Sequence, residues 1–153
     1  MEIEFIIEAF EKEQIATEIL NKLPEWFGLP DSTKEYIEES KSMPFLAAFE
    51  ENEPIGFMAL KETSKYTAEI YVMGVLKNRQ NSGIGTSLWK AFVQYAKDNG
   101  YEYVQVKTVK SGCYKEYDIT NNFYKKLGFR ELEVFPTLWD EWNPCQVYVY
   151  RIL

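Results

Sequence analysis

The stretch Gln80-Asn81-Ser82-Gly83-Ile84-Gly85 joins a segment with strand-like apolar spacing to one with helical spacing. Gly83 and Gly85 allow the backbone of this turn to approach a ligand without a Cβ atom in the way. The helix that follows begins with unpaired N–H groups and about half a positive charge, both of which attract an anion. We therefore predict that the turn is a backbone cradle for a phosphate-bearing ligand, for which a pyrophosphate is suitable.

The segments on either side of the turn carry different hydrophobic periods. Before it, residues 68–75 alternate, which predicts a strand with positions 68, 70 and 72 on one face and 69, 71 and 73 on the other. After it, residues 83–99 carry a helical apolar stripe that starts at Ile84, and Gly100 is placed to end the helix. The turn therefore lies where a strand gives way to a long amphipathic helix.

Patterns in the rest of the chain predict further strands and helices around this unit. We expect strands at residues 3–10, 45–50, 54–61, 103–108, 129–135 and 146–152, and helices at residues 11–23, 121–127 and after an N-cap at Asp31-Ser32. The order β-α-α-β-β-β-α-β-α-β-β predicts an α/β (α+β) fold with a mixed sheet and helices on its faces. With no linker or repeat, residues 1–153 are expected to form a single domain.

Two other nucleotide-binding motifs fit the turn poorly. A Walker A loop needs Gly-Lys-Ser/Thr, whereas Gly85 is followed by Thr86-Ser87. A dinucleotide-binding fingerprint needs a third glycine at position 88, which is Leu. A Gly-x-Gly pattern alone is also typical of an ordinary tight turn, so the assignment depends on the surrounding segments.

The composition argues against several classes of function. The chain carries a net charge of −7, so a nucleic-acid partner is not expected, because nucleic-acid phosphates bind positive surfaces. The acidity suits a cationic substrate, and it equally suits a protein whose charge only maintains solubility. The chain has no His, and Cys113 and Cys145 are isolated, so we predict neither a metal site nor a His-based triad.

No segment predicts export or a membrane span. The first residues, Met-Glu-Ile-Glu-Phe, lack the basic start and the apolar run of a signal peptide. No apolar stretch approaches the ~20 residues that cross a bilayer. We expect a cytoplasmic protein with no membrane partner, and the sequence leaves open whether it forms a homodimer.

Segments before and after the turn carry a resemblance to a known family. The Gln-x-x-Gly-x-Gly pattern of residues 80–85 follows the strand Glu69-Ile-Tyr-Val-Met-Gly-Val75, and Asn122-Phe-Tyr-Lys-Lys-Leu-Gly-Phe129 lies downstream. Together they resemble the acetyl-CoA-binding core of the GNAT superfamily of N-acetyltransferases, and the element order agrees over the whole chain. The resemblance implies a mixed, mostly antiparallel sheet of about seven strands with about four helices, and acetyl-CoA as cosubstrate.

The resemblance also implies the cofactor contacts. The backbone of residues 73–75 is expected to pair with the pantetheine arm and to polarise the thioester carbonyl, as a fixed donor does in an oxyanion hole. Many members carry Arg or Lys before the first glycine, whereas this chain has Gln-Asn-Ser, so backbone amides are expected to hold the phosphates. The expected cofactor-binding residues are Met73, Gly74, Val75, Gln80, Asn81, Ser82, Gly83, Ile84, Gly85 and Thr86.

Four side chains outside this set bear on the same ligand. Lys77, Arg79 and Lys125 either meet the outlying phosphates or are solvated surface charges. An Asn that often lies seven residues before the helix tyrosine of the family is Tyr117 here, so a cofactor contact from that side chain is in doubt.

Tyr124 matches the tyrosine of the Tyr-x-x-x-Gly-Phe element, which lies beside the thioester sulfur in relatives. Because a thiol has a pKa near 8.5 and a phenol near 10, Tyr124 is expected to share or donate a proton as the thiolate leaves. Glu69, fourteen residues before Gly83, stands where histone-acetylating members carry a catalytic glutamate. It is a candidate proton acceptor, through a water or a raised pKa, and the alternative is a solvent-facing strand carboxylate.

The acceptor site of the family is built by the early helices and by the loop between the last two strands. Trp26, Phe27, Trp139 and Asp140 lie in those segments and are candidate substrate residues, with core packing or a dimer contact as the alternative. The resemblance implies direct acetyl transfer from acetyl-CoA to a primary amine, and the acidity favours a small cationic metabolite or an antibiotic-like amine. A peptide or protein amino group, a longer acyl donor and a non-catalytic acyl-CoA sensor remain open.

Overall fold

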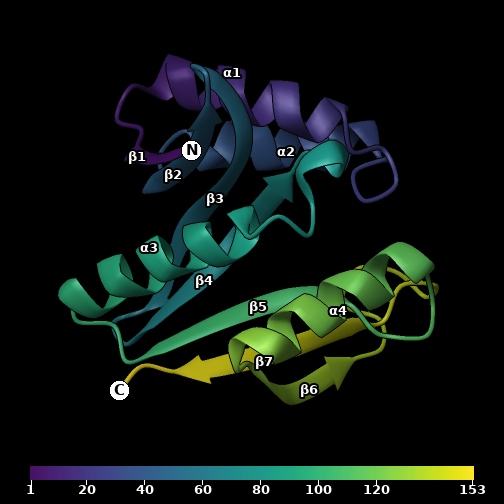
Figure 1. Cartoon of the computed structure of the whole chain (residues 1–153). Coiled ribbons are helices and arrows are strands. Elements are labelled where there is room, and N and C mark those ends of the chain that lie inside the picture. The colour runs from purple at the N-terminus through teal and green to yellow at the C-terminus, as the bar shows by residue number, and fades with distance from the viewer.

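The computed structural model describes residues 1–153 and contains one seven-stranded sheet in the order β1-β2-β3-β4-β5-β7-β6 (Figure 1). Neighbouring strands pair antiparallel except for β4 and β5, which are parallel. The mixed, mostly antiparallel sheet expected from the sequence is confirmed. The strands are β1 (Glu2–Phe5), β2 (Phe45–Glu50), β3 (Glu53–Ser64), β4 (Thr67–Val75), β5 (Tyr103–Val109), β6 (Arg130–Phe135) and β7 (Cys145–Arg151).

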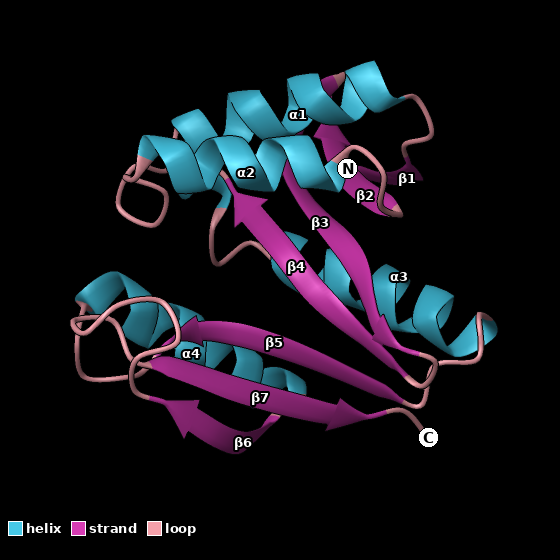
Figure 2. Ribbon diagram, turned by 180° about the vertical axis from the view of Figure 1, so that it is seen from behind, coloured by secondary structure: helices cyan, strands magenta, loops and turns pink.

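Four α-helices pack on the two faces of this sheet. They are α1 (Ala9–Asn21), α2 (Pro30–Ser40), α3 (Ile84–Asp98) and α4 (Lys115–Leu127), and a 3-10 turn, η1 (Lys77–Arg79), precedes α3. Figures 1 and 2 show α3 and α4 on one face and α1 and α2 on the other. A buried apolar cluster of 18 residues lies under α3 and α4, and one of 11 residues lies under α1. No helix is long and apolar enough to cross a membrane.

Strand β4 contains a β-bulge that changes the direction of its side chains. Leu60 pairs with Ile70 and Ala59 pairs with Val72, so Tyr71 is an extra residue in β4. Ile70 belongs to the cluster under α3, whereas Val72 belongs to the cluster under α1. The prediction that positions 68, 70 and 72 share one face is therefore wrong, because an extra residue interrupts the alternation.

Several predicted elements have other bounds in the structure, among them β1, α2 and α4. Strand β1 ends at Phe5 rather than at residue 10, and α1 already begins at Ala9. Helix α2 begins at Pro30, whose fixed φ suits a first helical position, so Asp31-Ser32 lies in the first turn instead of capping it. Helix α4 begins at Lys115 rather than at residue 121, because its first two turns are largely polar and carry little apolar periodicity.

Strands β4 and β5 pair over only part of their lengths. Residues Thr67 to Ile70 pair with Tyr103 to Val106, whereas β4 continues to Val75 and β5 to Val109. Figure 2 shows the two strands diverging beyond the paired region. The bulge at Tyr71 directly follows the last paired residue of β4, and bulges increase local twist and end pairing. The divergence creates a wedge between two parts of one sheet.

Candidate active site

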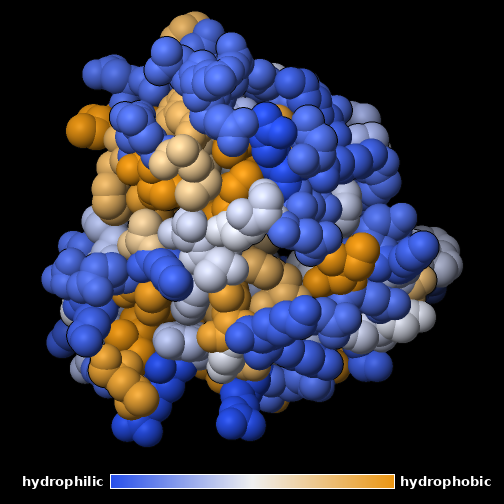
Figure 3. Space-filling model, viewed as in Figure 1, coloured by the Kyte–Doolittle hydropathy of each residue, from blue (hydrophilic) through white to orange (hydrophobic).

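A cleft of about 1440 Å³ occupies the wedge between β4 and β5. Its walls come from the α1–α2 loop, α2, β4, the turn before α3, β5, α4 and the β6–β7 loop. Figure 3 shows pale and orange residues gathered across the middle of this face of the molecule, between more hydrophilic surroundings. Segments that are far apart in the sequence therefore meet around one largely apolar cavity.

The turn before α3 leaves the first N–H groups of that helix without a side-chain partner. Gly83 is the N-cap, with φ +84°, and no side chain caps the helix. A Cβ atom at Gly83 would meet nothing within 4 Å, so glycine is needed here for its backbone conformation. A Cβ atom at Gly85 would lie 3.0 Å from the Phe123 ring, so Gly85 allows α3 to approach α4. The uncapped helix start borders the cleft.

Side chains of the same turn bind to the chain itself. The Gln80 amide donates a 3.0 Å hydrogen bond to the Val75 carbonyl, which ties the turn to the end of β4. Arg79 forms a 2.6 Å ion pair with Glu50, and the Ser82 hydroxyl donates to the Arg79 carbonyl. These contacts fix the shape of the turn while the helix start stays free.

Tyr124 lies on α4 at the wall of the cleft, buried among other rings. Its ring centroid is 5.6 Å from that of Phe129 and 6.2 Å from that of Tyr148. Burial raises the pKa of Tyr124, and the nearby Tyr117 and Tyr36 add to the shift. The phenol therefore stays protonated at neutral pH in a residue that lines the cleft.

One turn before Tyr124, a buried hydrogen-bond network fixes helix α4 to the sheet. The Asn121 side-chain amide donates to the carbonyls of Val109, at 2.9 Å, and Tyr117, at 2.6 Å. Its Oδ1 atom accepts a 2.6 Å bond from the Tyr148 hydroxyl. Asn121 and Tyr148 were not among the residues predicted from the sequence; the available signal was an uncharged amide one helical turn before a candidate catalytic tyrosine.

Glu69 lies beneath the cleft wall rather than on it. Its side chain is 8% exposed, and Lys107 of β5 donates a 2.8 Å hydrogen bond to its carboxylate. Lys107 lines the cleft, whereas Glu69 does not. The alternative of a solvent-facing strand carboxylate is wrong, because Glu69 is buried and ion-paired.

The α1–α2 loop is hydrogen-bonded to α4 across the cleft. The Trp26 indole N–H donates to the Glu116 carbonyl, at 3.2 Å, and to the Thr120 hydroxyl, at 3.1 Å. In return, the Tyr117 hydroxyl donates a 2.9 Å bond to the Trp26 carbonyl. Burial raises the pKa of Tyr117 to about 12, so this donor also remains protonated. Three hydrogen bonds therefore join the α1–α2 loop to α4 at one end of the cleft.

The chain matches the model of the acetyltransferase (GNAT) family over residues 5–129, which is most of its length. It belongs to the GNAT family. Its fold matches that of a GNAT-family protein from Desulfovibrio desulfuricans, with a TM-score of 0.83, 17% identity and 99% of each chain covered. An aminoglycoside 6'-N-acetyltransferase from Enterococcus faecium gives a TM-score of 0.78 at 21% identity, covering 100% of this chain and 98% of its own.

A third similar GNAT structure, an acetyltransferase from Elizabethkingia anophelis, has acetyl-CoA bound. It gives a TM-score of 0.71 at 21% identity and covers 88% of this chain and 89% of its own. At these identities the matches show the fold alone. No curated protein matches the chain.

The structure of this GNAT chain brings most of the predicted site residues to one cleft. Of the cofactor set, Ser82 and Ile84 do not line it: Ser82 binds the turn, and Ile84 is buried in the core. The predicted site residues that line the cleft are Met73, Gly74, Val75, Gln80, Asn81, Gly83, Gly85, Thr86, Tyr124, Trp26, Phe27, Trp139 and Asp140.

Asp140 has a different environment from the one expected. Its carboxylate accepts hydrogen bonds from the Asn143 side chain, at 2.8 Å, and from the backbone N–H groups of Trp142 and Asn143. The Asn143 hydrogen bond lowers the pKa of Asp140, and the two backbone bonds add to that effect. Asp140 therefore organises the β6–β7 loop.

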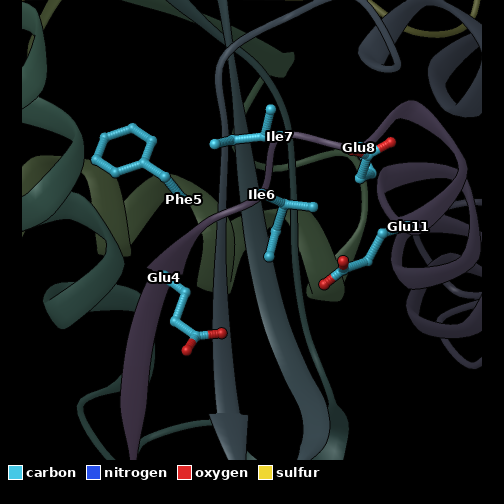
Figure 4. Close-up of a pocket in the computed structure, with 6 residues that line it drawn as sticks. All are labelled: Glu4, Phe5, Ile6, Ile7, Glu8 and Glu11. Atoms are coloured by element: carbon cyan, nitrogen blue, oxygen red, sulfur yellow. The ribbon is translucent and has the colours of Figure 1, made fainter.

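A second hollow, of about 610 Å³, lies at the junction of β1 and α1. Figure 4 shows the carboxylates of Glu4 and Glu11 on either side of Ile6. This hollow contains no cation or nucleophile, and it shares no lining residue with the cleft.

Proposed function

We propose that this GNAT chain transfers an acetyl group from acetyl-CoA directly to a primary amine. The observation that carries the proposal is the uncapped start of α3 in the same cleft as the buried, protonated Tyr124. The first feature suits an anionic phosphate group, and the second suits a leaving thiolate. The acetyl-CoA bound to the Elizabethkingia anophelis relative supports the choice of donor.

The phosphates are proposed to bind backbone N–H groups at Gly83, Gly85 and Thr86, which lie at the cleft wall. Lys77, Arg79 and Lys125 already pair with Glu25, Glu50 and Glu131. Lys126 lines the cleft and forms no ion pair within the chain, so it is the cation available to an outlying phosphate. The backbone of residues 73–75 is proposed to run beside the pantetheine arm.

In the proposed reaction the amine nitrogen attacks the thioester carbonyl carbon, a C–N bond forms and the C–S bond breaks. A backbone N–H of residues 73–75 stabilises the negative charge that develops on the carbonyl oxygen. The electron pair of the broken bond goes to sulfur, and the Tyr124 hydroxyl donates a hydrogen bond or its proton to it. Because burial raises the pKa of Tyr124, hydrogen bonding is favoured over complete proton transfer.

The proton of the amine is proposed to leave through water, with Glu69 as a further acceptor. Glu69 is separated from the cleft by Lys107, so direct contact with an acceptor would require the ion pair to open. The alternative role of Glu69 is to hold Lys107 in position. Glu69→Gln separates these roles: loss of a base flattens the pH profile of kcat, whereas loss of positioning raises KM for the amine.

The hydrogen-bonded end of the cleft favours a small-molecule amine over a peptide or protein amino group. The Trp26 and Tyr117 hydrogen bonds join the loop to α4 and would obstruct an extended chain. A small-molecule acceptor is also supported by the Enterococcus faecium relative, which is an aminoglycoside 6'-N-acetyltransferase. A non-catalytic acyl-CoA sensor is the remaining alternative.

Tyr124→Phe tests the proposal, with thiol release as the readout. We expect kcat to fall about 100-fold, the lower range for loss of a general acid, while the acetyl-CoA Kd stays the same. Tyr150→Phe is the control, because that ring packs on Trp89 at 5.0 Å outside the cleft. An unchanged kcat would remove the general-acid role. Acetyl-CoA binding with no acetylated amine would favour the sensor.

A further inference from the structure

The acidity of the chain is not found in the cleft. The whole chain has 24 Asp and Glu residues against 17 Lys and Arg residues. The cleft is lined by only two carboxylates, Glu25 and Asp140, against three cations, Arg79, Lys107 and Lys126. The excess negative charge therefore lies elsewhere on the molecule and does not identify the acceptor.

Both carboxylates of the cleft are already engaged. Glu25 accepts a hydrogen bond from Lys77, which lowers its pKa, and Asp140 is held by Asn143 and the loop backbone. Beneath the wall, the buried carboxylate of Glu69 is paired with Lys107. Asp140 is held by neutral donors and is the one cleft carboxylate without a cationic partner in the chain, so the cleft offers a counter-charge to one ammonium group and none to a second or third.

Aromatic rings line the hydrogen-bonded end of the cleft. Phe27, Tyr36 and Tyr71 pack edge-to-face in sequence, with centroid distances of 5.9 Å and 5.3 Å. The Tyr71 hydroxyl is bound to Glu39, as the Tyr117 hydroxyl is bound to Trp26, so these residues turn their polar ends toward the chain. Aromatic faces and edges remain to contact a ligand.

From these observations we infer that the acceptor is a monoamine with an aromatic or alkyl body, and not a polycation such as an aminoglycoside or a polyamine. The inference rests on the proposed acetyltransferase function. Rings bury an apolar body, and a single ammonium group gains a cation–π contact before it loses its proton. Asp140 offers a counter-charge to one ammonium group, whereas a second would meet Lys107 and no further uncompensated carboxylate.

Measuring kcat/KM for a panel of amines at one fixed concentration of acetyl-CoA tests the inference. The probes are 2-phenylethylamine, hexylamine, 1,6-diaminohexane, spermidine and kanamycin. Hexylamine and 1,6-diaminohexane share a six-carbon chain and differ in the second charge. We expect kcat/KM for hexylamine to exceed that for the diamine at least tenfold, and 2-phenylethylamine to be better still. Equal or higher kcat/KM for the diamine, spermidine or kanamycin would overturn the inference.

A charge added at the rim gives a second, independent readout. Leu138 is 53% exposed and lines the cleft, so Leu138→Glu places a free carboxylate there without disturbing the core. We expect kcat/KM for 1,6-diaminohexane to rise about fivefold and that for hexylamine to change little. The matched control is Leu132→Glu, because Leu132 is 62% exposed and lies outside the cleft. An equal effect of both variants, or none, would contradict the placement of the acceptor.

The panel also distinguishes a failure of this inference from a failure of the proposed acetyltransferase function on which it rests. If polycations are acetylated best, the acetyltransferase function stands and the monoamine class is wrong. If none of the five amines releases thiol although acetyl-CoA binds in calorimetry, the proposed function fails, and the inference fails with it.

Discussion

The two ends of the cleft are built in different ways. The end at the start of α3 is formed by backbone: a glycine at φ +84°, uncapped helix N–H groups and the diverging edge of β4. The other end is formed by side chains that come from the α1–α2 loop, α2, α4 and the β6–β7 loop. The specificity of a site that binds its ligand through the backbone is difficult to change by mutation. The specificity of a site that binds through side chains changes with each substitution. We expect the first end to bind the common cosubstrate and the second to select the acceptor.

Gly83→Val should have the largest effect, because it disrupts the end of the cleft that is formed by backbone. A β-branched residue at φ +84° is strained, and relief of that strain should move the helix start and weaken acetyl-CoA binding at least 100-fold in calorimetry. Gly100→Val is the matched control: it lies at the other end of α3, with the same φ and no atom within 4 Å of its Cβ position. Similar stability losses but unequal affinities are expected. Equal affinities would remove the turn from the binding site.

The next largest effect should come from the network that holds α4 between the two ends. Asn121→Ala leaves the buried Tyr148 hydroxyl without its acceptor, so the free energy of unfolding should fall by about 2–3 kcal/mol. Tyr148→Phe removes the unpaired hydroxyl and should restore part of this loss in the double variant, measured by urea denaturation. If the stability losses of the two single variants add up to that of the double variant, the hydrogen bond contributes no coupling free energy.

Trp26→Phe should weaken acceptor binding at the end of the cleft formed by side chains and leave the end formed by backbone unchanged. The change removes the indole hydrogen bonds to Glu116 and Thr120, so we expect the KM of the acceptor to rise about tenfold. The acetyl-CoA Kd should not change. Trp142→Phe is the control, because Trp142 is 71% exposed and does not line the cleft. A shift in acetyl-CoA affinity as large as the KM effect would show that the two ends are not separable.

The smallest predicted effect separates the contribution of side-chain charge to acetyl-CoA binding from that of the backbone N–H groups. Lys126→Ala is expected to weaken acetyl-CoA binding about fivefold at low salt, and less at high salt, because the ammonium group is solvated. Lys125→Ala is the neighbouring control, since Lys125 pairs with Glu131 and lies outside the cleft. If both variants behave alike, neither lysine meets a phosphate.

The contrast also explains which features could be predicted from the sequence. A glycine before an apolar stripe is a local signal, and it predicts the start of α3, where Gly83 is the N-cap. The bulge at Tyr71 depends on pairing between β3 and β4, and no local pattern marks it. Without the bulge, strict alternation gave the wrong face for Val72.

For the acceptor end, the sequence predicts the segments that line the cleft but not the contacts that their side chains make. Trp26 and Asp140 line the cleft, but their partners, Thr120 for the indole and Asn143 for the carboxylate, decide what these groups can bind. The pairing of Glu69 with Lys107 joins residues 38 positions apart and depends on the parallel register of β4 and β5. Net charge was a poor guide, because it does not report where the charges lie.

Amide hydrogen exchange with and without acetyl-CoA tests the division of the cleft most directly. Backbone N–H groups that bind a ligand exchange more slowly than free ones. We predict that acetyl-CoA slows exchange at residues 73–75 and 83–86 and leaves the β6–β7 loop around Trp139 unchanged. Protection of that loop, with none at the start of α3, would contradict the account.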